Sequence, residues 1–156
     1  MNEEKINFLK KRFTSLLKGA GSDTKPAWGK MTLQQMIEHF SDSVRIASGK
    51  TKHQTILTPE ENIQRMQDFI MSDKPFKENT KNSLLSETPA PVRNKTIDEA
   101  INELQKEIDY FFTVFSSNQH LTTRNPFFGD LNFEINVQLL YKHAMHHLQQ
   151  FGITTL

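Results

Sequence analysis

Apolar residues recur at helical spacing in four long segments of the chain, at residues 3–18, 33–48, 97–118 and 131–151. Each segment places its apolar side chains on one face at about 3.6 residues per turn, which is typical of an amphipathic helix. The clearest such face belongs to the second segment and consists of Leu33, Met36, Ile37, Phe40, Val44 and Ala47. The pattern predicts four helices that bury these faces against one another.

Helix-capping residues support the same boundaries. Residues 32–35 and 96–99 have the Thr-x-x-Gln and Thr-x-x-Glu patterns of a capping box at a helix start. Asp130 is expected to cap the last helix, while Gly49 and Gly152 follow the second and fourth segments as typical C-terminal stops.

The stretch between the second and third long helices, about 49–96, predicts a long crossover. Thr58 as N-cap and Pro59 at the first position predict a short helix over 59–71. Residues 73–95 are rich in Pro, Asn, Lys and Ser and are expected to be extended. No segment shows the alternation of a strand. The fold is therefore predicted to be all-α, a four-helix bundle with one long crossover.

Composition and charge narrow the function classes. The chain has 156 residues, enough for a single helical domain over 1–156, and a formal net charge of +1, which gives no attraction to nucleic acid or to an acidic membrane. It has no cysteine, which excludes disulfides and a thiolate nucleophile. We expect no signal peptide and no membrane span of about 20 apolar residues, and hence a cytoplasmic protein.

Three of the six histidines fall within five positions of "LLYKHAMHHLQQFG", residues 139–152. On a helical projection His147 lies about 70° and His143 about 110° from the centre of the apolar face, on the same flank. His146 points nearly opposite the core and is expected to be solvated. On the second helix His39 also lies about 110° from the centre of its apolar face.

The pair His143 and His147 has the i, i+4 spacing that brings two imidazoles onto one metal ion. A third imidazole from His39 would complete a three-nitrogen face that suits Zn, Ni or Fe and leaves positions open for water or substrate. The alternative is that these side chains lie at a helix edge and pair with carboxylates or solvent. His53 and His120 fall in loops or helix ends and are expected at the surface.

Three separated motifs resemble the DinB/YfiT-like superfamily. They are "WGKMTLQQMIEHFSDSVRIASG" (28–49), "NPFFGDLN" (125–132) and "YKHAMHHLQQFG" (141–152), in the order of that superfamily. They are similar to a branch with a Trp-Gly-Lys-Met lead-in, a Pro-Phe-Phe-Gly turn and a closing His-His-Leu-x-Gln-Phe-Gly.

This resemblance implies an up-down-down-up bundle that holds a divalent metal (Ni, Zn or Fe) through one histidine of the second helix and two of the last. On this chain they are His39, His143 and His147. Members of the superfamily include S-transferases that use low-molecular-weight thiols, isomerases and hydrolase-like enzymes, and many are homodimers.

Other residues receive supporting roles. Trp28, Gly29, Phe127, Phe128 and Gly129 are expected to shape the ends of the bundle.

Polar residues on the flanks of the ligand histidines are Ser43, Asn136 and Gln150, and these could orient ligands or substrate. Glu38 projects away from the His39 flank, and no general base can be assigned.

The sequence therefore predicts a metal-dependent enzyme that acts on a small molecule, with S-transfer from a low-molecular-weight thiol ahead of hydrolysis. The resemblance to the superfamily implies a homodimer. The alternative is a helical module that binds a metal or a small ligand without catalysis.

Overall fold

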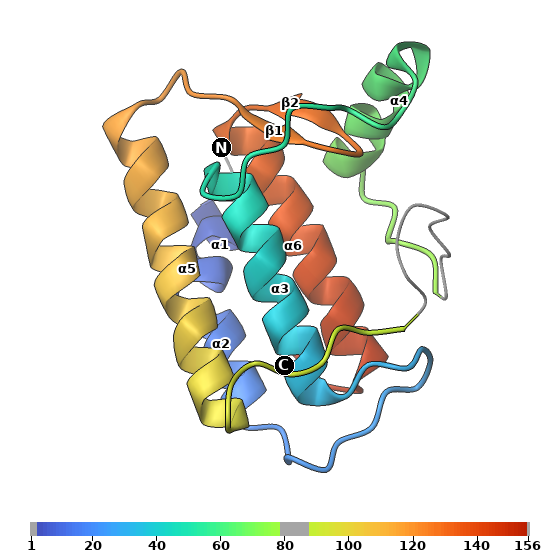
Figure 1. Ribbon diagram of the computed structural model, residues 1–156, viewed down its shortest axis with the longest axis vertical. Helices are drawn as coiled ribbons and strands as arrows, with labels where there is room; N and C mark the ends of the chain where they lie inside the picture. The colour runs from blue at the N-terminus through green and yellow to red at the C-terminus, as the bar shows by residue number, and fades with distance from the viewer. Residues whose placement is uncertain (1–2, 79–87, 156) are drawn as a thin grey trace.

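The computed structural model describes residues 3–78 and 88–155. Its elements in chain order are α1 (Glu3–Asn7), η1 (Phe8–Arg12), α2 (Phe13–Lys18), α3 (Leu33–Ser48), α4 (Glu60–Met71), α5 (Ile97–Ser117), β1 (Thr123–Asn125), β2 (Gly129–Leu131) and α6 (Phe133–Gln150). Figure 1 shows α3 between α5 and α6, with the α1–α2 segment behind them. The predicted four-helix bundle is confirmed.

The directions of the bundle helices follow the predicted up-down-down-up order. Helices α3 and α5 run in the same direction, and α6 and the α1–α2 segment run in the opposite direction (Figure 1). Two parallel neighbours need a long connection, and α4 with the extended residues on either side of it supplies that connection. Residues 79–87 of the predicted extended stretch lie outside the described residues.

The first helix contains a π-helical turn that apolar spacing alone did not predict. The backbone N–H of Phe13 donates to the carbonyl of Phe8, a five-residue step. The π turn brings both rings to the core side, where their centroids lie 6.1 Å apart and both residues are buried. In an ideal α-helix two residues five positions apart would point about 140° away from each other. Burial of both rings accounts for the wider turn.

The long helices bury the apolar faces that the sequence predicts. The apolar face of α3 from Leu33 to Ala47 is buried throughout, and the capping box between Thr32 and Gln35 is present with both of its hydrogen bonds. In α5 the Thr96 side chain accepts from Glu99 N–H as predicted, but the Glu99 carboxylate accepts from the N–H of Lys95 instead of closing the box.

The predicted start of the last helix and the predicted absence of strands were both wrong. Helix α6 starts at Phe133, because the Asn132 side chain accepts from the Ile135 N–H, whereas Asp130 pairs with Arg124. That ion pair spans a short antiparallel hairpin of β1 and β2, whose three-residue strands are too short to show alternation.

The hairpin and the start of α4 meet at the "NPFFG" turn. Thr58 does not cap α4; its hydroxyl donates to the carbonyl of Phe127, and Pro59 takes the cap position. Gly129 has φ of +82°, and Phe128 packs on a small apolar cluster around Ile70. The turn thus joins the crossover to one end of the bundle, as the sequence led us to expect for these residues.

Candidate metal centre

The structure brings His39, His143 and His147 together between α3 and α6. The Nε2 atom of His143 lies 3.3 Å from Nε2 of His39 and 2.8 Å from Nε2 of His147. One nitrogen from each of the three side chains lies within 4.8 Å of the other two. Two nitrogens bound to one tetrahedral zinc ion are about 3.3 Å apart, since each Zn–N bond is about 2.0–2.1 Å. The cluster therefore has the dimensions of a metal site.

Regular helix geometry is sufficient to produce this convergence. His143 and His147 lie one turn apart on α6, so both imidazoles project from the same flank. His39 projects from the facing edge of α3, the neighbouring helix in Figure 1.

The surroundings of the cluster are aromatic. The ring of Phe40 stacks on His143 with centroids 4.8 Å apart and an interplanar angle of 27°. Phe76, from the segment after α4, contacts His143 and His146 edge-on at 6.4 and 5.9 Å between centroids. No carboxylate joins the three-histidine group within residues 3–78 and 88–155, so the alternative of histidine–carboxylate pairs is not what forms here.

Burial among these rings lowers the pKa of each histidine in the cluster. The pKa of His147 falls to about 3, mainly through desolvation and partly through the neighbouring His39, against the opposing effect of its hydrogen bond to Gln150. Desolvation and the three nearby histidines hold the pKa of His143 well below its ordinary value. Desolvation also lowers the pKa of His39, although the charge of Asp42 opposes it. The imidazoles are therefore neutral at neutral pH, which is the form that binds metals.

Of the three residues expected to orient ligands, one contacts the cluster. The Oε1 atom of Gln150 lies 2.7 Å from Nδ1 of His147. Ser43 instead donates to the backbone carbonyl of His39. Asn136 is buried and donates to Thr123 Oγ1 and the Leu131 carbonyl, so it ties α6 to the hairpin.

The expectation for His146 was wrong. Its ring is half-buried, with the Trp28 ring at 5.6 Å between centroids and the Phe76 ring on another side. The bundle leaves this side of α6 open, but the segments around residues 28 and 76 cover it, and helix periodicity carries no information on such segments. His120 is exposed as expected, and His53 is half-buried.

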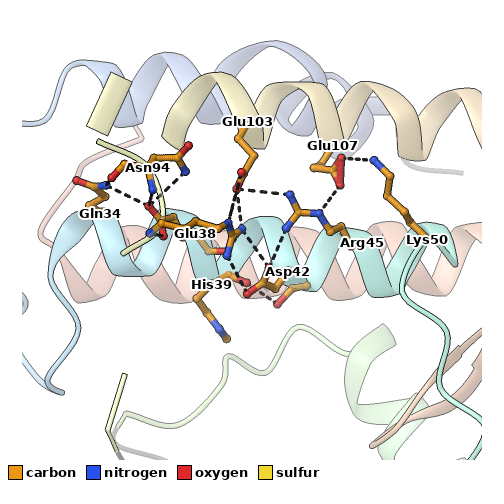
Figure 2. Close-up of polar contacts among 11 residues, drawn as sticks. Gln34, Glu38, His39, Asp42, Arg45, Lys50, Asn94, Glu103 and Glu107 are labelled. Carbon is orange, nitrogen blue, oxygen red and sulfur yellow. Dashed lines mark hydrogen bonds and ion pairs between the residues drawn. The ribbon is translucent and has the colours of Figure 1, made fainter. Parts of the chain in front are cut away.

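Beside the cluster, Glu38 has a structural role that the sequence did not indicate. It points away from His39, as expected, but it is only 4% exposed and accepts hydrogen bonds from the backbone N–H groups of Arg93 and Asn94. Figure 2 shows it at one end of a row of polar contacts between α3 and α5 that continues through Glu103 and Arg45. The row holds the start of α5 against the helix that carries His39.

The fold and the cluster define a helical bundle with a three-histidine site that could hold a metal ion. The chain belongs to the DinB superfamily, whose family model matches residues 10–151. Neither the curated proteins nor the solved structures give a significant match. Among the described residues, no helix combines the length and the apolar character that crossing a membrane requires.

Proposed function

We propose that the protein binds one divalent metal ion, Ni, Zn or Fe, through Nε2 of His39, His143 and His147 and is a metal-dependent enzyme. The observation that carries this proposal is the convergence of three neutral imidazole nitrogens within 4.8 Å, from buried His147 and half-buried His39 and His143. Three nitrogen ligands on one side of an ion are the donor set of catalytic zinc sites and leave coordination positions for water or substrate. When bound, the metal would act as a Lewis acid that favours the ionised form of a water or a thiol.

S-transfer from a low-molecular-weight thiol is the reaction we favour. The chain contains no cysteine, so a sulfur nucleophile has to come from a co-substrate. Hydrolysis is faster where a residue also accepts a proton from the attacking water. The nearest buried carboxylate in sequence, Glu38, is occupied by hydrogen bonds from the 93–94 backbone. In the proposed reaction the thiol gives its proton to solvent, its sulfur bonds to an electrophilic carbon, and the leaving group takes the electron pair of the broken bond.

The residues of the chain would position and shield the reacting groups. Phe40 and Phe76 exclude water from two sides of the imidazoles, which strengthens polar interactions within the site. The hydrogen bond to Gln150 orients His147.

Elemental analysis of the tag-free protein tests the metal site. We expect about one Ni, Zn or Fe per chain in the wild type and in a control with the exposed substitution His120→Ala, and none in the double variant His143→Ala/His147→Ala. A wild type that stays empty after incubation with each metal would contradict the proposal.

Activity assays then separate the reactions. The loaded protein should accelerate the reaction of cysteine with 1-chloro-2,4-dinitrobenzene, and the double variant should not. Hydrolysis of p-nitrophenyl acetate without any thiol would favour a hydrolase instead. A loaded protein that is inactive in both assays would favour the non-catalytic binding module.

A further inference from the structure

Gln150 makes two side-chain hydrogen bonds that together determine which nitrogen of His147 carries a proton. Its Nε2 atom donates to the backbone carbonyl of Trp28 at 2.9 Å, and its Oε1 atom lies 2.7 Å from Nδ1 of His147. A backbone carbonyl can only accept, so the amide NH₂ must face Trp28 and the amide oxygen must face His147. Nδ1 of His147 is therefore the protonated nitrogen, and Nε2 presents its lone pair to the other two imidazoles.

The backbone around residue 28 is built to approach Gln150 closely. The N–H of Ala27 donates to the Gln150 carbonyl at 2.7 Å, so this segment is attached to the end of α6 by a backbone hydrogen bond as well. Gly29 follows with φ of +81°, and a Cβ atom at this position would lie 2.9 Å from Nε2 of Gln150. A glycine at position 29 permits both the left-handed backbone and the close approach.

We propose that Gln150, the Trp28 carbonyl and Gly29 form a positioning unit that holds His147 in its Nδ1-protonated form with Nε2 directed at the metal position. This assigns the Trp-Gly lead-in, which lies more than a hundred residues away in sequence, a role in the metal site in addition to shaping the end of the bundle. The protonation state of His147 can be observed in the metal-free protein, whereas the consequence for metal binding rests on the proposed function.

The expected effect on metal binding follows from the role of such outer hydrogen bonds. A ligand histidine that loses the partner of its other ring nitrogen is free to change tautomer and to rotate, and metal affinity typically falls by about 10–100-fold. Gln150→Leu removes both hydrogen bonds. Gln150→Glu keeps an acceptor for His147 but cannot donate to Trp28. Its metal affinity should therefore fall less than that of Gln150→Leu.

Gly29→Ala should act through Gln150, and Gly152→Ala is its matched control. Both glycines have positive φ, so alanine is strained at either position, but a Cβ atom at Gly152 would have no neighbour within 4 Å. Gln149→Leu, at the exposed neighbour of Gln150, is the control for the leucine substitution.

Two measurements on these variants test the proposal. Long-range ¹H–¹⁵N correlation spectra of metal-free protein report which ring nitrogen of His147 is protonated. We expect Nδ1 in the wild type and both controls, and loss of this single tautomer in Gln150→Leu and Gly29→Ala. Zn²⁺ affinity, measured by competition with a chromophoric chelator, should fall about 10–100-fold in the same two variants relative to their controls.

Protonation of His147 at Nε2 in the wild type, or unchanged spectra in Gln150→Leu, would overturn the positioning role. Zn²⁺ affinities equal to those of the controls would overturn its consequence for the metal. A wild type that shows the Nδ1 tautomer but binds none of the three metals would refute the proposed function, while the positioning of His147 would stand.

Discussion

Glu38 joins helix α3 to the segment that leads into α5, through hydrogen bonds to residues 93 and 94. Glu38→Ala should break these hydrogen bonds and lower the stability of the protein. Its carboxylate accepts from the backbone N–H of Arg93 at 2.7 Å and of Asn94 at 3.1 Å, and from the side-chain amide of Gln34 at 3.1 Å. The Arg93 guanidinium in turn donates to the carbonyl of Glu38 at 3.3 Å. Alanine would remove the carboxylate that accepts from the two backbone N–H groups and from Gln34, while the two helices still pack together (Figure 2).

The expected loss of stability follows from the number of donors that are left without an acceptor. A hydrogen bond to a charged group contributes about 1.5–3 kcal/mol, and the two backbone donors would lose one each. Because Arg93 is exposed and water can replace part of the loss, we take the lower end and expect about 3 kcal/mol. For a chain of this size that lowers Tm by roughly 6–12 °C.

Urea denaturation followed by circular dichroism measures this difference, with the exposed Glu61→Ala on α4 as the control. The pH dependence adds a second test. Burial alone would raise the pKa of Glu38, but hydrogen bonds from Arg93, Gln34 and Asn94 outweigh it and the pKa lies below its ordinary 4.5. The unfolded state thus binds the proton first on acidification, so the stabilisation is present above pH 4.5 and is lost as pH falls through the lower folded value. An ordinary surface substitution changes the free energy of unfolding by up to about 0.5 kcal/mol. If Glu38→Ala lies within that range of the Glu61→Ala control, Glu38 does not anchor this segment.

Other elements of the structure give further expectations. The pKa of His147 is lowered to about 3, so the unfolded state takes up a proton first as pH falls below the ordinary 6.5, and His147 should account for about 2 kcal/mol of the stability that metal-free protein loses by pH 5. Because the pKa values of His39 and His143 are lowered as well, chemical denaturation across pH should show a loss that is about 2 kcal/mol smaller in His147→Gln than in wild type and His120→Gln. Lys142 is buried and donates to the carbonyls of Ser72 and Lys74 after α4. Lys142→Met should therefore lower the free energy of unfolding by about 1–3 kcal/mol and speed hydrogen exchange in α4, whereas the exposed Lys106→Met should do neither.

The helices that the sequence predicted best are those with local signals at both ends. The capping box at Thr32, the apolar face of α3 and the stop at Gly49, with φ of +78°, all depend on residues within the same segment. The start of α6 shows the limit of such signals. Asp130 and Asn132 are both good N-cap residues two positions apart, and the ion pair between Asp130 and Arg124 across the hairpin decides between them.

The π turn at Phe8 shows a different limit. Ile6, Leu9 and Phe13 fit an ordinary helix by spacing, so the pattern gave no reason to expect a wider turn. The turn forms because Phe8 is buried as well, and its ring contacts Tyr141 of α6 at 5.3 Å between centroids. That partner is distant in sequence and no local pattern identifies it.

The histidine cluster could be predicted because it depends on two rigid helices alone. A residue about 110° from the centre of an apolar face lies at the edge of the buried stripe, where it can meet the edge of a neighbouring helix. His39 and His143 occupy such edges, so their angles were enough to bring them together once α3 and α6 pack side by side.

The contacts that orient and cover the cluster come instead from connecting segments. The Trp28 carbonyl reaches Gln150, and Phe76 covers His143, through chain paths that have no periodicity. Helix geometry therefore predicts which side chains could hold a metal, whereas the protonation state and accessibility of those side chains depend on loops. This division explains why His146, on the same helix as two of the three histidines, was assigned to solvent although its ring lies half-buried against Trp28.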